Sequence, residues 1–486
     1  MSLAESTSPP SSATEAGGRH WESRQVAALA IVALCGVLVS LTQSILIPVL
    51  GAIQLDLGTT TTQTEWLLTS TLLVAAVAVP VFGRLGDLHG KRLMLLVAAA
   101  ALAVGSLVCA LSDSIGWMIV GRVVVGLSTA AIPLGISLIG SVLPPEHAGS
   151  GIALVSATLG IGGALGLPLA ALVAEHSDYH VLFWICAAGG LIAVAGVWFA
   201  VSEPPRGDRG RFDLVGSVLL AAALVSLLLP LAEATSWGWG DARTVVLLVL
   251  AAVLLAVFVL VERRVRSPLV DMVVNARPSL LLTNIASLCV GFALFASFIG
   301  TAGYVQAPAA SGYGFGSSVL ASGLAMLPSG LAMLALSPVS AALSARLGPK
   351  ITLAIGAVVV ALGFVSRIVL VDSFWQIVLG TTIAGAGTGI AYAAMPSLIL
   401  EAAPKSELAA ANGLNALSRS VGSSLASAIG GTLLAASTVT LGAFVLPSLT
   451  AYRTLFGICA GAAVLGAVIA LVIPAADREL VGGHTA

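Results

Sequence analysis

Few side chains in this sequence of 486 residues could carry acid, base or ion-pair chemistry, because only 9% of the residues are charged. Two arginines, Arg122 and Arg419, lie inside long apolar segments, and two glutamates, Glu65 and Glu233, lie at the ends of such segments. An ionisable group among apolar residues is costly and usually indicates a function. Such arginines could pair with a carboxylate, phenolate or sulfonate, and the glutamates could bind and release protons.

Other kinds of site chemistry find no support. The five cysteines stand alone in apolar segments, and the six histidines lie outside them, so neither a metal site nor a disulfide framework is indicated. Phosphate-binding loops and nucleophile motifs are absent from the sequence, and with a net charge of −1 it shows no basic block for nucleic acid. We therefore expect neither an enzyme nor a cofactor. A membrane-embedded enzyme or receptor stays as a remote alternative.

One short segment concentrates charge between two apolar segments. "GRLGDLHGKR", residues 83–92, contains three glycines that permit a tight turn. Asp87 could satisfy nearby donors or face the positive end of another helix, and Lys91 and Arg92 could hold the loop at a membrane surface. An ordinary basic loop would also fit this composition.

Long apolar segments must position these residues. The chain is 58% hydrophobic with a mean hydropathy of +1.06, which predicts an all-α integral membrane protein. Breaks at Gly, Pro and charge clusters predict fourteen transmembrane helices. Their approximate ranges are 26–50, 66–83, 93–112, 115–141, 149–174, 180–201, 213–234, 243–262, 279–303, 318–343, 350–371, 374–400, 407–436 and 452–474.

The distribution of lysine and arginine predicts the orientation. If the N-terminus is cytoplasmic, sixteen of the 21 basic residues fall in inner segments, two in outer loops and three inside helices. This excess follows the positive-inside rule and places both termini in the cytoplasm, with the chain in the cell inner (plasma) membrane. Residues 1–25 are polar and Pro-rich and read as a disordered cytoplasmic tail, and residues 475–486 form a second tail.

An internal repeat divides the predicted helices. Gly126 and Pro133 recur as Gly389 and Pro396, and "SARLGPK" (344–350) echoes the charged segment, with Ala345 where Asp87 stands. Two six-helix bundles, residues 26–201 and 279–474, would account for this pattern. Residues 202–278 would contribute two inserted helices, 213–234 and 243–262, peripheral to the central cavity. Such repeats place a substrate site near the middle of the membrane.

Several motifs resemble those of the major facilitator superfamily. The segment 83–92 matches the G-x-x-x-D-x-x-G-[RK]-[RK] loop through Gly83, Asp87, Gly90, Lys91 and Arg92, and "GRVVVG" carries the embedded arginine at Arg122. "GIGGALGLP" resembles the helix-5 motif of antiporters through Gly160, Gly162, Gly166 and Pro168, but has Gly163 and Leu167 where proline is frequent. "NGLNALSRSVG" (412–422), with Asn412, Asn415 and Arg419, is similar to a segment of fourteen-helix drug:proton antiporters.

This resemblance implies a major facilitator fold and a role for the charged loop. The loop would act as a conformational latch, in which Asp87 engages the loop basics and the start of helix 13 in the other bundle. Where relatives carry an acid in helix 1, this chain has Thr42, followed by Gln43. A proton would then use Glu65 or Glu233, or travel on the substrate itself.

Each candidate charge also has a plain structural interpretation. Glu65 and Glu233 could be exposed carboxylates of outer loops, and Arg419 could contact helix-end carbonyls. We expect Arg367, near the outer end of its helix, to extend its charge to the membrane surface.

These observations together predict a secondary active exporter of amphipathic, drug- or antibiotic-like small molecules. It would work by alternating access as a proton antiporter, and a facilitator or importer of a small metabolite is the alternative. Because the embedded charges are basic, neutral or anionic substrates should be preferred over cations. Its partners would be the substrate, protons and membrane lipid, and the protein would be a monomer.

Overall fold

The computed structural model describes residues 23–204, 212–265, 268–404, 407–441 and 444–474. Within them, the first half folds as α1 (Ser23–Ser44), η1 (Ile47–Val49), α2 (Leu50–Asp56), α3 (Thr61–His89), α4 (Lys91–Ala110), α5 (Ile115–Leu127), η2 (Ser128–Ala130), α6 (Ala131–Val142), α7 (Pro145–His176) and α8 (His180–Ala200). Next come α9 (Leu214–Ala232), α10 (Ala234–Trp237), α11 (Ala242–Glu262) and α12 (Met272–Asn275).

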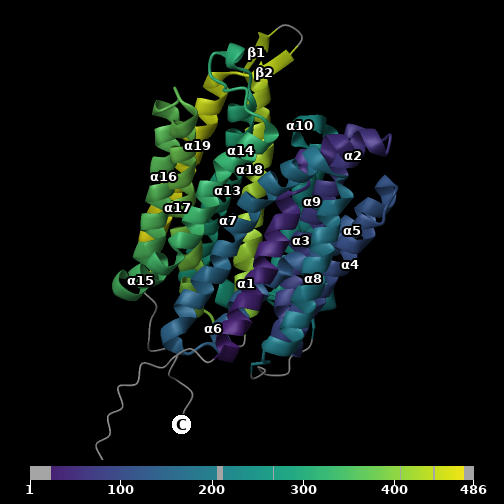
Figure 1. The fold of residues 1–486 in the computed structure, drawn as a ribbon. Helices are drawn as coiled ribbons and strands as arrows, with labels where there is room; N and C mark the ends of the chain where they lie inside the picture. Colours follow the sequence, from purple (N-terminus) through teal and green to yellow (C-terminus); the bar gives the residue numbers. More distant parts are fainter. Residues whose placement is uncertain (1–22, 205–211, 266–267, 405–406, 442–443, 475–486) are drawn as a thin grey trace, which may run out of the picture.

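The second half contains α13 (Pro278–Gln306), η3 (Ala309–Ser311), α14 (Val319–Ala335), α15 (Ser337–Leu347), α16 (Pro349–Val369), α17 (Phe374–Ala402), α18 (Leu408–Ala436) and α19 (Leu449–Val472). A small antiparallel hairpin, β1 (Thr438–Leu441) and β2 (Phe444–Pro447), pairs Thr438 with Pro447 and precedes α19. The hairpin lies at one end of the molecule, and the sequence patterns did not predict it (Figure 1).

The membrane fold is confirmed. Thirteen segments of the described chain are long and apolar enough to cross a membrane. Helix α18, the thirteenth predicted span, is 29 residues long but is not among them, because small and polar residues interrupt its apolar character. The count of fourteen spans therefore stays a prediction. Helix α1 begins at Ser23, inside the predicted tail, and the rest of both tails lies outside the described residues.

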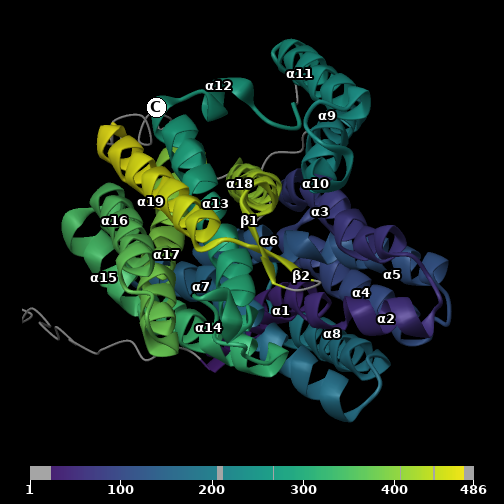
Figure 2. The ribbon, with the colours of Figure 1, turned by 90° about the horizontal axis from the view of Figure 1, so that it is seen from above.

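The two halves meet along two seams. At one, α3 packs against α18; at the other, α7 packs against α14, with α15 continuing the contact. Helix α18 lies beside α3 and α9, whereas α7 and α14 lie on another side of the molecule (Figure 2). We name the two ends of the bundle after residues of α3, the Asp87 end and the Glu65 end.

The inserted helices occupy unequal positions. Helix α9 packs against both α3 and α18, so it covers their seam, whereas α11 packs chiefly against α9. Figure 2 shows α11 outside α9. That the inserted helices are peripheral to the central cavity stays a prediction. The far end of α9 lines a second cavity, which is described below.

The charged segment 83–92 is not a loop. Helix α3 continues to His89 and α4 begins at Lys91, so Gly90, at φ +116°, alone connects them. Gly83 and Gly86 permit close helix packing instead of a turn, since a β-carbon at Gly83 would lie 2.8 Å from the carbonyl oxygen of Ala409 in α18. Of the three glycines expected to permit a tight turn, Gly90 makes the turn, whereas Gly83 and Gly86 are packing surfaces.

Arg367 also differs from its expected place. Its side chain does not reach the surface: it is 0% exposed, and its guanidinium donates to Ser297 Oγ at 2.9 Å and to Thr301 Oγ1 at 2.8 Å. The Phe456 ring lies 3.9 Å from its central carbon. Two hydroxyls of α13 and an aromatic face replace water around this charge.

Candidate functional site

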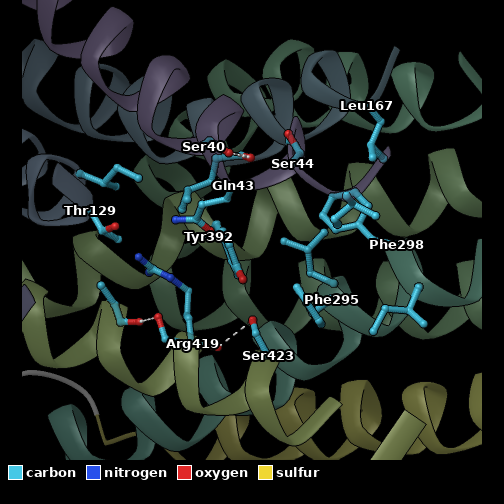
Figure 3. Close-up of a pocket in the computed structure, with 18 of the residues that line it drawn as sticks. Ser40, Gln43, Ser44, Thr129, Leu167, Phe295, Phe298, Tyr392, Arg419 and Ser423 are labelled. Atoms are coloured by element: carbon cyan, nitrogen blue, oxygen red, sulfur yellow. Dashed lines mark hydrogen bonds between the residues drawn. The ribbon is translucent and has the colours of Figure 1, made fainter. Parts of the chain in front are cut away.

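A central cavity of about 400 Å³ lies between the two halves. Its walls come from α1, η1, α3, η2, α6 and α7 of the first half and from α13, α17 and α18 of the second. Most of the lining is apolar, with Phe295 and Phe298 along α13. Figure 3 shows Gln43, Tyr392 and Arg419 around this space.

Arg419 is the charge of the central cavity. Its NH1 donates to Asn415 Oδ1 at 2.7 Å, and its guanidinium lies 4.9 Å from the centre of the Tyr392 ring. Asn415 is oriented in turn, because its amide donates to Ser287 Oγ at 2.6 Å and Asn284 Oδ1 at 3.1 Å. The expectation that Arg419 contacts helix-end carbonyls is wrong, since its partners are the Asn415 side chain of α18 and the Tyr392 ring of α17.

A second cavity, of about 280 Å³, continues from the central cavity toward the Glu65 end. The two share Gln43, Ile47, Phe295 and Ser423 in their walls. We call the second space the acidic cavity, because Glu65 of α3 and Glu233, between α9 and α10, both line it.

The two glutamates differ in exposure. Glu233 is 4% exposed and accepts a hydrogen bond from Ser236 Oγ at 2.8 Å, whereas the side chain of Glu65 is exposed. Among the described residues, neither carboxylate lies within 4.0 Å of a basic group. The interpretation of Glu233 as a loop carboxylate is wrong, because the end of α9 carries it into the seam.

Arg122 lies in the wall of the acidic cavity. Its Nε donates to the carbonyl of Leu67 in α3 at 3.2 Å, and its NH1 donates to the carbonyl of Thr42 in α1 at 3.1 Å. The Thr42 carbonyl is available because α1 ends at Ser44, and the last carbonyls of a helix lack intrahelical partners. Arg122 thus ties α1 to α3 beside the two glutamates.

Two predicted candidates serve local structure. The Thr42 hydroxyl donates to the Val39 carbonyl at 2.7 Å, and the Asn412 amide donates to the Leu408 carbonyl at 2.8 Å. Neither residue lines the two cavities, whereas Gln43, the neighbour of Thr42, lines both. Helix α1 contains no acidic residue, and the residue of α1 that lines both cavities is the amide Gln43.

At the Asp87 end, Asp87 closes the seam between α3 and α18. Its carboxylate accepts hydrogen bonds from the backbone N–H groups of Ala409 at 3.3 Å and Ala410 at 3.0 Å. These belong to the first turn of α18, whose own N-cap residue, Glu407, provides no side-chain cap. Asp87 takes the place of that cap from the other half of the protein, where its charge also favours the positive end of the helix dipole.

The basic residues next to Asp87 divide their contacts. Lys91 Nζ lies 3.9 Å from Asp87 Oδ1 and donates to Ser141 Oγ at 3.3 Å. Arg92 does not engage Asp87: its NH2 donates to the Trp198 carbonyl at 2.5 Å, and its backbone N–H donates to Glu203 Oε1 at 3.4 Å. Arg92 therefore fixes the end of α8.

The glycines of residues 160–168 let α7 approach two helices. β-Carbons at Gly162 and Gly166 would collide with α1, at Val37 and Ser44, and one at Gly160 would collide with Met333 of α14. Gly163 lines the central cavity, and Pro168 packs against Gly323 of α14. Glycines on two faces thus let α7 pack closely against α1 of its own bundle and α14 of the other half.

Comparison with known proteins decides the family. The sequence model of the Major Facilitator Superfamily matches residues 32–327 and 289–485, which together cover most of the chain. This chain belongs to the major facilitator superfamily. The predicted family is thereby confirmed, and membership indicates a transporter rather than an enzyme.

Individual members resemble the chain over much of its length. The tetracenomycin C resistance and export protein of Streptomyces glaucescens is 30% identical over 429 residues, which cover 86% of this chain and 76% of that protein. The multidrug resistance protein Stp of Mycobacterium tuberculosis is 27% identical over 376 residues, covering 76% and 69%. The human organic anion transporter MFSD10 (TETRAN) shares the fold, with a TM-score of 0.65 and 12% identity over 92% of this chain and all of that one.

Sequence reasoning missed several residues of this major facilitator protein. The serines Ser40, Ser44, Ser420 and Ser423 line the central cavity, but serine in an apolar helix carries no distinctive signal. Glu203 lies just beyond α8 and contacts the turn at Gly90, which only the fold reveals.

Proposed function

We propose that this major facilitator protein exports amphipathic, drug- or antibiotic-like small molecules in exchange for protons. The observation that carries the proposal is the pair of adjoining cavities, central and acidic, with the α3–α18 seam closed at the Asp87 end. An apolar cavity with a few polar groups suits an amphipathic molecule. The names of its relatives, which include export of tetracenomycin and multidrug resistance, support the same class of substrate.

The Asp87 end is proposed to face the cytoplasm. Basic residues concentrate there: Lys91 and Arg92 begin α4, Arg263 and Arg264 follow α11, and Arg277 precedes α13. Both the first described helix and the last would then have their termini on that side. The protein would act as a monomer surrounded by lipid.

Alternating access requires the α3–α18 seam to open at the Asp87 end. The Asp87 contact holds it closed by hydrogen bonds to two N–H groups that belong to the other half. Breaking this contact while the acidic cavity closes would turn the central cavity toward the cytoplasm. Asp87 is the proposed latch, and Gly83 and Gly413 allow its helices to meet closely.

The proton would bind at the acidic cavity. Glu65 and Glu233 line one space, so protonation of one would relieve its repulsion with the other. The shared wall residues Gln43 and Phe295 would bring a substrate in the central cavity near these carboxylates. Occupation of one cavity could then affect the other.

The test uses purified protein in proteoliposomes with an imposed pH gradient. Tetracenomycin C is the first compound assayed, and Glu65→Gln with Glu233→Gln is the decisive double variant. We expect the double variant to lose acceleration by the gradient, whereas Glu175→Gln, which changes an exposed carboxylate at the end of α7, should behave as the wild type.

Unaltered gradient-driven export by the double variant would exclude both glutamates as the proton-binding site. A proton carried by the substrate would then be the remaining explanation. If the pH gradient does not change the transport rate of the wild type, proton antiport is contradicted, and a facilitator or importer of a small metabolite is favoured.

A further inference from the structure

The central cavity contains a positive charge without a counter-ion. Arg419 is 6% exposed, and in the described part of the chain no carboxylate lies within 4.0 Å of it. A guanidinium keeps its charge at any physiological pH, and an unpaired buried charge is costly. The amide oxygen of Asn415 and the Tyr392 ring compensate it only in part.

The arginine is held in a fixed position rather than free to move. Asn415, which accepts from NH1, is itself bonded to Ser287 and Asn284 of α13. The Tyr392 ring covers one face of the guanidinium. Because only NH1 donates to a described side chain, donors of the same planar group remain for a ligand in the cavity.

Two further polar groups face the same place. Gln43 and Tyr392 line the cavity, and in the described structure neither side chain forms a hydrogen bond. An amide and a phenolic hydroxyl can both donate to an oxygen anion. Arg419, Tyr392 and Gln43 thus present donors from three helices around one space (Figure 3).

The opposite wall suits an aromatic ring. Phe295 and Phe298 lie along α13, and Leu167 of α7 lies beside Phe298 in the lining (Figure 3). Aromatic side chains stack on flat rings in offset or edge-on arrangements. The cavity therefore has a cationic, hydrogen-bonding side and an aromatic side.

We propose that Arg419, with Tyr392 and Gln43, binds the carboxylate or phenolate of an aromatic ligand whose rings lie against Phe295 and Phe298. This assignment rests on the proposed function only in taking the central cavity as the substrate site. The site would therefore select acidic aromatic molecules, and the negative charge of the bound ligand would be the counter-ion of Arg419.

The test compares two probes of nearly the same shape. 2-Naphthoate carries a carboxylate and 2-naphthamide is neutral, and both are titrated onto the full chain in nanodiscs of phosphatidylcholine. We expect the wild type to bind the naphthoate at least about tenfold more tightly, as for a hydrogen-bonded charge pair. Arg419→Gln should bind both equally, and Arg419→Lys should keep part of the preference. Arg243→Gln, which changes an arginine that lines neither cavity, should keep all of it.

A second variant keeps the proposal testable if Arg419→Gln does not fold. Tyr392→Phe keeps the ring but removes the hydroxyl, so it should weaken naphthoate binding severalfold and leave naphthamide unchanged. Equal affinity of the wild type for both probes, no naphthoate binding, or a full preference in folded Arg419→Gln would overturn the assignment. Failure of gradient-driven export with the naphthoate preference intact would overturn the proposed antiport and not this site.

Discussion

The two seams between the halves are held together in different ways. Along α7 and α14, glycines of each helix meet larger residues of the other, from Gly160 and Met333 to Gly323 and Pro168, and α15 extends the contact to the Asp87 end. Along α3 and α18, close contact occurs at the Asp87 end, and the acidic cavity separates the helices toward the other end. One seam is uncharged and continuous; the other is charged and half open.

This difference indicates where the protein can switch. Packing of small residues is insensitive to protonation and has nothing to release, so the α7–α14 seam is suited to be the pivot. The α3–α18 seam has a carboxylate at each extreme, Asp87 and Glu65, and either can gain or lose a partner. The echo segment 344–350 has an exposed Ala345 in place of Asp87, so the charge is not repeated at the pivot.

The largest expected effect comes from filling the α7–α14 seam. A β-carbon at Gly330 would lie 2.9 Å from the Gly160 carbonyl oxygen and would collide with Ala164. Gly330→Val should therefore cost ~1–3 kcal/mol or more of folding free energy, as overpacking does. Thermal unfolding in detergent should show a melting temperature lowered by several degrees. Gly461→Val in α19, where nothing lies within 4 Å, is the control and should unfold like the wild type.

An intermediate effect is expected at the charged seam. Asp87→Asn removes the charge that caps α18 and should cost the closed Asp87 end about 1–2 kcal/mol, equivalent to roughly a 5- to 30-fold shift in population. The five native cysteines are buried, so Thr129→Cys in the central cavity can report accessibility. Its reaction with an impermeant maleimide applied at the Asp87 end should accelerate accordingly.

The matched control for this change is Asp241→Asn. Asp241 caps α11, a helix that forms neither seam, by accepting from the backbone N–H of Arg243. It should leave the labelling rate unchanged. Equal rates for Asp87→Asn and the wild type would show that packing alone closes the seam.

The smallest effect is expected at Glu407, which precedes α18. Burial and the nearby Asp271 raise the pKa of Glu407 above its ordinary value. Since the folded protein binds this proton more tightly, Glu407 lowers stability as the pH rises through its pKa. Glu407→Gln should raise the free energy of unfolding at pH 7 to 8 by less than about 1 kcal/mol, because the group is partly solvated. The melting temperature should therefore rise slightly at pH 7 to 8 and stay unchanged at pH 4. A gain that persists at pH 4 would assign the effect to helix packing.

Much of the fold followed from the sequence because apolar length is a local property. The predicted ranges agree with the helices within a few residues at most ends, and the antiporter-like glycines lie on α7 as expected. Contacts across the fold did not follow. Segment 83–92 was interpreted as a loop because its glycines break isolated helices, whereas neighbours such as Ala409 and Leu134 stabilise it as a helix. The hydrogen-bond partners of Arg367 and the burial of the Glu233 side chain in the acidic cavity depend in the same way on helices that are distant in the sequence.

The position of α9 has a consequence for the surrounding lipid. A half-open seam would otherwise offer acyl chains a route into a space lined by Glu65, Glu233 and several serines, where hydrocarbon satisfies no polar group. Helix α9 covers this gap, Trp239 after α10 donates to Thr432 of α18 at 2.8 Å, and α11 turns an apolar surface outward. The inserted pair would therefore seal the acidic cavity against lipid, so that water and ions could enter it while acyl chains could not.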